Sequence, residues 1–366
     1  MATALKYMYN PSFFDRLCPI LKDRIPGFDC RDFIFRIFNN EWPDLELKER
    51  VRHISTVLHH FLSKDFSEAT QQLIAISQTL KSRHFREQGF ENIFLADYIE
   101  VFGLEHPEES FLALEEITKL VSAEFALRPF IVRYPGRAME YLYKWSRHKD
   151  ANVRRLSSEG SRPRLPWAIG LPDFKKDPAP ALPILENLRE DPSEYVRRSV
   201  ANHLNDIAKD HPDIVIELVK KWQGKHPGTD WIIRLGCRSL LKSGHTQALT
   251  LHGFDPDSQA RIRELLLPTK VKIGQYLDFK FAFISKEKKP TNFRLEYAID
   301  YLTSTGKTSR KVFKISENLF LPGKPVTIRR KQSFKNFTTR KHFRGKHFLS
   351  ILANGKKLAT TEFIVC

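Results

Sequence analysis

Two stretches of the chain, about forty residues apart, share one local design. Residues 150–155 read DANVRR, and residues 191–198 read DPSEYVRR. In both, an acidic residue is followed by a valine and then by two adjacent arginines, a composition that suits the start of a helix. A helical pattern that recurs at this interval predicts a stack of helix pairs, so the repeat restricts much of the chain to a helical solenoid.

The expected helix starts indicate the kind of repeat. Asp150 is placed to cap one helix, and Asp191 with Glu194 is placed to form a capping box at the next. Thr229 precedes a third expected start. Intervals of roughly forty residues between such starts are typical of HEAT and armadillo repeats, and they predict a mainly α fold.

The spacing of the apolar residues divides the chain into three regions. Helical spacing predicts a bundle over residues 1–110 that leads into HEAT-like repeats over residues 111–268. Over residues 269–366 the period changes to two, as in residues 293–301, which predicts strands with one buried face. Residues 354–355, Asn-Gly, are a strong hairpin signal. We therefore expect a HEAT-like α-helical solenoid followed by an all-β immunoglobulin-like sandwich.

The positive charge is concentrated in the last of these regions. The whole chain carries a net charge of +17, and residues 269–366 hold 22 Lys and Arg against 6 Asp and Glu. Residues 328–331 and 339–347 are the most basic runs. Such an imbalance indicates binding to nucleic acid, to a membrane surface or to an acidic partner.

The remaining composition excludes several classes of protein. The four cysteines are scattered, with no CxxC pair and no histidine at metal-ligand spacing, so we expect no disulfide framework, no metal and no cofactor. No apolar run approaches the length of a membrane span, and the first residues do not resemble a signal peptide. A cytoplasmic protein without a membrane association is expected.

The paired arginines have a structural and a functional interpretation. An arginine early in a repeat helix can bond to the neighbouring repeat, and Arg154 and Arg197 fit that role. Adjacent residues on a helix point about 100° apart, however, so both members of a pair cannot serve the same ladder. We expect at least one of each pair to remain for an anionic ligand such as phosphate.

Glu159 also has two interpretations. It lies one turn after Arg155, where an exposed ion pair contributes only a few tenths of a kcal/mol. The helix is followed by a proline-broken loop with Arg162, Arg164 and Trp167, and binding residues concentrate in loops held on a rigid scaffold. Trp167 equally suits a role as a core anchor beneath the loop.

Three segments of the chain resemble the AlkC and AlkD type of DNA alkylation repair glycosylases, and the AlkC branch in particular. They are residues 122–130, SAEFALRPF, residues 154–167, RRLSSEGSRPRLPW, and residues 199–206, SVANHLND. The resemblance covers roughly residues 100 to 260 and is most specific between Glu159 and Trp167.

The resemblance implies a HEAT-like solenoid that removes N3-methylated bases, such as 3-methyladenine and 3-methylcytosine, from duplex DNA without flipping the base. It implies that Glu124, Glu159 and Asp206 are the catalytic carboxylates and that Trp167 contacts the lesion. It also implies a C-terminal immunoglobulin-like domain, as in some AlkC proteins. A monomer that binds alkylated duplex DNA, in a bacterial-type cytoplasm and associated with the nucleoid, is the corresponding expectation.

Basic residues in both regions are expected to hold DNA phosphates. These candidates are Arg155, Arg162, Arg164, Arg197, Arg198, Arg234, Arg340, Lys341, His342, Arg344 and Lys346. No lysine stands out as a Schiff-base nucleophile, so we expect a monofunctional glycosylase without strand cleavage.

Two other functions remain open from the residues alone. One is a non-catalytic HEAT-repeat scaffold that binds DNA or an acidic protein partner. Carboxylates within a basic surface count against this function, because a passive anion binder gains nothing from them. The other is a catalytically inactive protein that recognises DNA damage.

Overall fold

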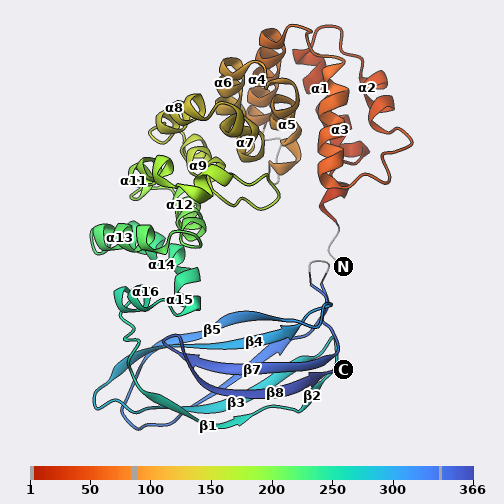
Figure 1. Ribbon diagram of the computed structural model, residues 1–366. Helices are drawn as coiled ribbons and strands as arrows, with labels where there is room; N and C mark the ends of the chain where they lie inside the picture. Colours follow the sequence, from red (N-terminus) through yellow and green to blue (C-terminus); the bar gives the residue numbers. More distant parts are fainter. Residues whose placement is uncertain (1–3, 84–88, 338–339) are drawn as a thin grey trace. The chain divides into compact units, whose positions relative to one another are not determined.

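The computed structural model describes residues 4–83, 89–337 and 340–366, in which a long series of helices precedes a β-sandwich (Figure 1). The α-helices are α1 (Pro11–Arg24), α2 (Cys30–Ile37), α3 (Leu47–His59), α4 (Phe66–Ser82), α5 (Phe94–Phe102), α6 (Pro107–Ile117), α7 (Glu124–Arg133), α8 (Pro135–Trp145), α9 (Ala151–Gly160), α10 (Pro172–Lys176), α11 (Leu182–Leu188), α12 (Glu194–Ile207), α13 (Pro212–Trp222), α14 (Pro227–Gly236), α15 (Arg238–Ser243) and α16 (Thr246–Leu251). Within the described ranges, no helix is long and apolar enough to cross a bilayer.

The strands follow the last helix. They are β1 (Ala260–Leu266), β2 (Lys270–Val271), β3 (Tyr276–Ser285), β4 (Thr291–Leu302), β5 (Thr308–Phe320), β6 (Val326–Ser333), β7 (Gly345–Ala353) and β8 (Lys356–Val365). The chain folds as two compact units, the first running up to Asp210 and including Gly224–Leu235, and the second comprising His211–Gln223 and Gly236–Cys366.

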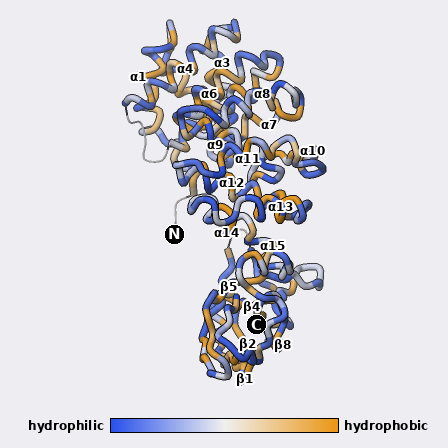
Figure 2. The backbone as a smooth tube through the Cα atoms, turned by 90° about the vertical axis from the view of Figure 1, so that its left-hand side faces the viewer, coloured by the Kyte–Doolittle hydropathy of each residue, from blue (hydrophilic) through white to orange (hydrophobic). Residues whose placement is uncertain are grey.

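The first unit is a stack of helices in which near neighbours along the chain pack against one another. Helix α9 contacts α7, α8, α11 and α12 (Figure 1). Each of these helices has buried apolar residues. Along the helices, hydrophobic residues recur at short intervals between hydrophilic ones (Figure 2). This amphipathic pattern explains why each helix buries one face, and it confirms the predicted HEAT-like α fold.

The expected helix caps are confirmed at one of three positions. The Asp150 carboxylate accepts a 2.8 Å hydrogen bond from the amide of Asn152 at the start of α9. Helix α12 begins at Glu194 and its N-cap residue is Ser193, so the predicted capping box with Asp191 is wrong. Asp191 accepts instead from the amide of Ser193, at 2.8 Å.

Thr229 is not a cap either. It lies inside α14, and its hydroxyl donates to the carbonyl oxygen of Arg189 at 2.8 Å. The region boundaries also differ from those predicted: residue 110 falls within α6, and the strands begin at Ala260 rather than after residue 268.

The strands form two sheets that enclose one apolar core. Their orders are β1-β3-β6 and β2-β8-β7-β4-β5 (Figure 1). Alternate residues of β3, including Phe279, Phe281 and Phe283, are at most 1% exposed and fill this core, as their spacing predicts. Asn354 (φ 45°) and Gly355 (φ 78°) form the predicted turn between β7 and β8. The immunoglobulin-like architecture is confirmed.

Strand β4 departs from the predicted pattern because both of its faces are buried. Arg294 and Glu296, expected on an exposed face, are 4% and 0% exposed. Arg294 donates to Glu296 at 2.6 Å and also pairs with Glu317 of β5. Buried charges of opposite sign compensate each other, and an alternating sequence then no longer marks a solvent face.

Candidate active site

Three helices of the first unit bring the predicted carboxylates together. Glu124 is the first residue of α7, Glu159 lies in the last turn of α9, and Asp206 lies in the last turn of α12. Because α9 packs against both α7 and α12, the three side chains belong to one region of the stack. Glu159 is 5% and Asp206 is 2% exposed, so both are buried.

Arg162 joins two of these carboxylates. Its Nη1 donates to Oε1 of Glu159 at 2.6 Å, and its Nε donates to Oδ2 of Asp206 at 2.9 Å. Ser199 Oγ donates to Oε2 of Glu159 at 2.7 Å, and Lys209 Nζ donates to Oδ1 of Asp206 at 3.0 Å. An unpaired buried carboxylate is strongly destabilising, so these donors compensate for burial and fix both acids in position.

Arg155 joins the third carboxylate to the same network. Its Nη1 donates to Oε2 of Glu124 at 3.0 Å, and its Nη2 lies 3.5 Å from Oε1 of Glu159. Its guanidinium carbon lies 4.8 Å from the centre of the Tyr195 ring. Burial opposes the charged form, but Glu124 and Glu159 hold the pKa of Arg155 above its usual range.

Acids and bases therefore alternate along one chain of contacts, which we call the acid–base network. Its members, in order, are Glu124, Arg155, Glu159, Arg162, Asp206 and Lys209. At the Glu124 end the network borders a cavity of 340 Å³ that Ser122, Asn152 and Tyr195 also line. This end gives a ligand access to an acid of the network.

Arg128 holds the loop that follows α9. The residue is 0% exposed, and its Nη1 donates to the carbonyl oxygens of Gly160 and Arg162, each at 2.9 Å. Its Nε donates to the carbonyl oxygen of Ile169 at 2.6 Å. Burial, and next the charge of Arg162, lower the pKa of Arg128 to about 10. One buried cation thus fixes both ends of the loop.

Trp167 lies near the middle of this loop, and its side chain is 59% exposed. The structure therefore excludes the core-anchor interpretation. Its φ of 67° is in the left-handed region, which a bulky residue rarely adopts. The indole is consequently available to a ligand, on a loop whose ends are held beside Glu159 and Arg162.

His203 contributes a dependence of stability on pH. Its ring is fully buried, with Nδ1 lying 3.0 Å from the carbonyl oxygen of Ser158. Burial, and next the charge of Arg162, lower the pKa of His203 from 6.5 to about 3. Between these values the unfolded chain binds a proton that the folded chain does not, so stability falls as the pH falls.

We therefore expect the free energy of unfolding to decrease by on the order of 2 kcal/mol between about pH 6.5 and pH 4.5 because of this one group. Urea unfolding at several pH values measures the decrease. In His203→Leu the decrease should be smaller. Equal slopes for the variant and the wild type would contradict the assignment.

The first arginine pair is engaged entirely within the fold. Arg154 binds both carboxylate oxygens of Asp191, which lies before α12 in the next repeat. Arg155 binds Glu124 and Glu159, as described above. The structure does not support the inference that one member of this pair remains for phosphate, because each arginine binds an acid and the two side chains are only 16% and 12% exposed. Arg155 and Arg162 are partners of carboxylates, and their placement contradicts the predicted phosphate contacts.

The second arginine pair, Arg197 and Arg198, includes a side chain that is largely exposed. Nη1 of Arg197 donates to the carbonyl oxygens of Asp191 and Pro192, each at 2.8 Å, which is the structural role left open for it. Arg198 has a side chain that is 58% exposed and pairs with Glu194 on its own helix. Arg164 pairs with Asp210, and Arg234 is exposed. Phosphate binding by these residues stays a prediction.

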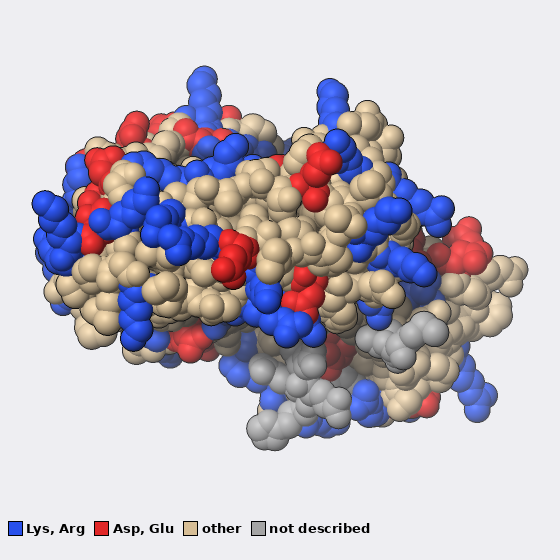
Figure 3. Space-filling view, turned by 90° about the horizontal axis from the view of Figure 1, so that it is seen from below, with Lys and Arg blue, Asp and Glu red and all other residues tan. Residues whose placement is uncertain are grey.

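The basic run of the sandwich has both open and buried members. Lys341 and Arg344 are exposed, Arg340 lies over the Tyr301 ring at 5.5 Å, and Lys346 pairs with Glu362 at 3.0 Å. Figure 3 shows Lys and Arg spread in several groups over one face of the molecule, with acidic side chains less widespread. Residue 339 of this run lies outside the described residues.

His342 differs from its neighbours because it is 6% exposed. Its ring centroid lies 4.9 Å from that of Phe334 and 5.4 Å from that of Tyr301. Burial, and next the charge of Arg340, lower the pKa of His342, which favours the neutral ring. This placement contradicts the predicted DNA contact of His342.

No cluster of His, Cys, Asp and Glu in the described part of the chain has the arrangement of a metal site. The sequence patterns did not point to four residues that contact the site, namely Arg128, Tyr195, Ser199 and Lys209. Lys209 had a usable signal, because it lies three residues after Asp206, whereas Ser199 carries no local sign of its contact with Glu159. Lys311 was also missed; it lines a 230 Å³ cavity with Arg340 and Lys341.

The fold and the acid–base network together define a HEAT-like repeat protein with a C-terminal immunoglobulin-like domain. Residues 261–366 match the family described as "Uncharacterised protein YhaZ, C-terminal Ig-like domain". The whole chain is similar to the alkylpurine DNA glycosylase AlkC of Pseudomonas fluorescens, solved bound to DNA containing an abasic site analog, with 36% identity, 100% of each chain covered and a TM-score of 0.92.

A second relative is similar over the same length. The chain is 42% identical to the "Uncharacterized protein YhaZ" of Bacillus subtilis (strain 168) over 363 residues, which cover 99% of each protein. These full-length similarities show that the chain belongs to the AlkC family, which confirms the resemblance seen in the sequence.

Proposed function

We propose that this protein is a monofunctional DNA glycosylase that excises cationic N3-alkylated bases, 3-methyladenine and 3-methylcytosine, from duplex DNA. The observation that carries the proposal is the acid–base network, in which Glu124, Glu159 and Asp206 are joined within one region of the stack. The family supports it, because the similar AlkC of Pseudomonas fluorescens is an alkylpurine DNA glycosylase.

The chemistry of the lesion suits such a site. An N3-methylated base is already cationic, so it leaves as a neutral molecule without protonation by a general acid. The bond from the base nitrogen to C1′ breaks, the deoxyribose becomes oxocarbenium-like, and water forms the new bond to C1′ and loses a proton. Fixed carboxylates stabilise the developing positive charge and position the water.

The pairing of the acids has a consequence for this mechanism. Glu159 uses one oxygen for Arg162 and the other for Ser199, so its position is fixed before DNA binds. Each carboxylate oxygen has two acceptor positions, which leaves capacity for water. Preorganised charges of this kind act without reorganising during the reaction. We propose Glu159 and Asp206 as the principal catalytic carboxylates, with Glu124 and the Trp167 indole shaping the lesion site.

The indole also bears on how the base is reached. Trp167 is 59% exposed on a loop that is held at both ends, so much of its surface is open to a ligand. We propose that it contacts a lesion that stays in the duplex. An aromatic face attracts a cation and so favours methylated over unmodified bases.

The direct test is to incubate the purified protein with methylated duplex DNA and to separate the released bases by chromatography. We expect 3-methyladenine and 3-methylcytosine in the supernatant and intact strands that break only after alkali treatment of the abasic sites. DNA binding without release of either base would instead indicate a non-catalytic scaffold or an inactive recognition protein.

Phosphate binding is assigned to cations of both units that are exposed or partly exposed. They are Arg164, Arg198, Arg234, Arg340, Lys341, Arg344 and Lys346. Each phosphate contact releases counterions, so the logarithm of the binding constant falls with the logarithm of the salt concentration by about 0.9 for each contact.

Replacing Arg340, Lys341 and Arg344 together by Ala should weaken binding to any duplex and lower the salt slope by about 2 to 3. Fluorescence anisotropy at several salt concentrations measures both quantities. The matched control replaces Lys286, Lys288 and Lys289, three exposed lysines of the same sandwich that we expect only to be solvated. Equal losses in the two triple variants would show a general charge effect and contradict the assignment.

A further inference from the structure

The Trp167 backbone is held in a conformation that its own chemistry disfavours. A bulky residue at φ 67° is strained, and such strain persists only where the surroundings enforce it. Arg128 binds carbonyl oxygens at 160, 162 and 169, so it fixes the loop on both sides of Trp167 without touching that residue. A separate contact at Trp167 itself is therefore needed to hold its backbone in this conformation.

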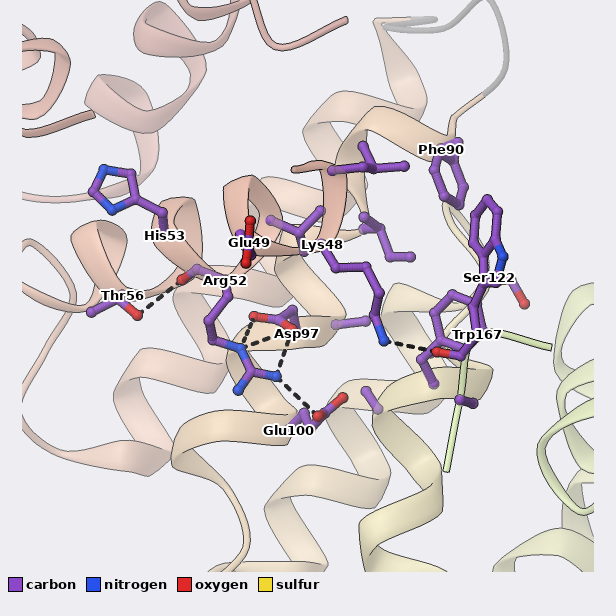
Figure 4. A pocket seen from close by; sticks show the side chains of 18 of the residues that line it. Lys48, Glu49, Arg52, His53, Thr56, Phe90, Asp97, Glu100, Ser122 and Trp167 are labelled. Atoms are coloured by element: carbon purple, nitrogen blue, oxygen red, sulfur yellow. Dashed lines mark hydrogen bonds and ion pairs between the residues drawn. The ribbon is translucent and has the colours of Figure 1, made fainter. Parts of the chain in front are cut away.

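Lys48 makes that contact from a distant part of the sequence. It lies in the first turn of α3, and its Nζ donates to the carbonyl oxygen of Trp167 at 2.7 Å (Figure 4). The same ammonium group lies 5.8 Å from the centre of the Phe125 ring. Because Phe125 follows Glu124 at the start of α7, Lys48 contacts both the indole loop and the helix that carries an acid of the network.

A cavity beside this contact gives the peptide room to relax. The cavity has a volume of 480 Å³, and Trp167 lines it together with residues of α3, α5 and α7. In Figure 4 Lys48 extends toward the loop, whereas Arg52 turns to Asp97 and Glu100. In a closely packed site, neighbouring atoms would hold the strained peptide without help; next to open space, the bond from Lys48 carries more of that task.

We propose that Lys48 is a positioning residue that holds Trp167 in its left-handed conformation and so presents the indole to the lesion. The inference rests on the proposed glycosylase function and extends it to the N-terminal helices, which otherwise serve as scaffold. Lys48 acts through Trp167 and does not touch the reacting atoms. Its removal should therefore slow base release without weakening the binding of undamaged DNA.

The test compares Lys48→Met, which keeps the aliphatic stem, with Lys48→Arg, which restores a cationic donor. Arg52→Met is the matched control, because Arg52 lies one turn further along α3, lines the same cavity and binds two acids but not Trp167. Three quantities are measured for each variant: the single-turnover rate of base release, the affinity for undamaged duplex, and the ¹⁹F resonance of Trp167 in protein labelled with 5-fluorotryptophan. Trp167→Phe assigns that resonance among the five tryptophans.

We expect Lys48→Met to lower the release rate about tenfold and to shift the Trp167 resonance. Duplex affinity should stay within about twofold, and Lys48→Arg should recover most of the rate. Arg52→Met should keep both the wild-type rate and the wild-type resonance. An unchanged rate or resonance in Lys48→Met, or an equal loss in Arg52→Met, would overturn the inference.

The same set of measurements separates this inference from the proposed function. A wild-type protein that releases no base overturns the glycosylase proposal, and with it the catalytic purpose of Lys48. The resonance of Trp167 still decides whether Lys48 holds the loop. Normal release by the wild type together with normal release by Lys48→Met overturns the role of Lys48 and leaves the glycosylase proposal intact.

Discussion

Glu159→Gln should lower base release from methylated duplex DNA by about 10² to 10³-fold while leaving DNA binding close to that of the wild type. Glutamine has the same shape, and its carbonyl oxygen can still accept a hydrogen bond from Arg162 or Ser199. It lacks the negative charge that would stabilise the oxocarbenium-like sugar. Single-turnover release and anisotropy with undamaged duplex measure the two effects separately.

The control is Glu140→Gln, the same change in a side chain that is 65% exposed on α8 and pairs with Arg137. It should leave release and binding unchanged. Normal release by Glu159→Gln would remove Glu159 from its catalytic role. Loss of binding and release together would indicate that the substitution disturbed the fold, which urea unfolding would reveal.

Arg162→Met should lower the free energy of unfolding by about 3 to 5 kcal/mol. The Arg162 side chain bridges Glu159 and Asp206, which are 5% and 2% exposed. Loss of Arg162 therefore leaves two buried carboxylates without their shared partner. Exposed ion pairs are worth far less: Arg198→Met, which removes a pair between side chains that are each 58% exposed, should cost at most about 0.5 kcal/mol.

A double-mutant cycle isolates the contact that matters. Asp206→Asn removes one of the two charges that Arg162 compensates, so Arg162→Met should cost less in that background than in the wild type. Urea unfolding at neutral pH gives all four free energies. If Arg162→Met instead weakened DNA binding with a stability loss below about 1 kcal/mol, a phosphate-binding role would replace the bridging role.

The spacing of the apolar residues predicted the architecture well, because this spacing reflects only neighbouring residues in the sequence. The alternation of Phe279, Phe281 and Phe283 and the Asn354-Gly355 turn have local physical causes, and the structure confirms both. The capping box failed for a non-local reason. Asp191 binds the guanidinium of Arg154 from the preceding repeat, and that stronger partner is invisible to a local motif.

The site was predictable as a set of acids but not as a network. The sequence indicated Glu159 because it lies one turn after Arg155 and just before the loop with Arg162. Whether Arg162 binds a phosphate or two carboxylates, however, depends on how α9 packs against α12. Ser199 contacts Glu159 and Lys48 contacts Trp167, although the two residues of each contact lie far apart in the sequence. Contacts of this kind follow from tertiary packing, which no local pattern encodes.

In the proposed mechanism, fixed carboxylates stabilise positive charge on the deoxyribose. The most direct measurement is the affinity of the protein for two duplexes that differ only at the lesion, one with a cationic 1-aza-deoxyribose and one with neutral tetrahydrofuran. We expect at least about tenfold tighter binding of the cationic duplex, and a clear reduction of that preference in Glu159→Gln. Equal affinities for the two duplexes, or a preference that the variant retains in full, would contradict the mechanism.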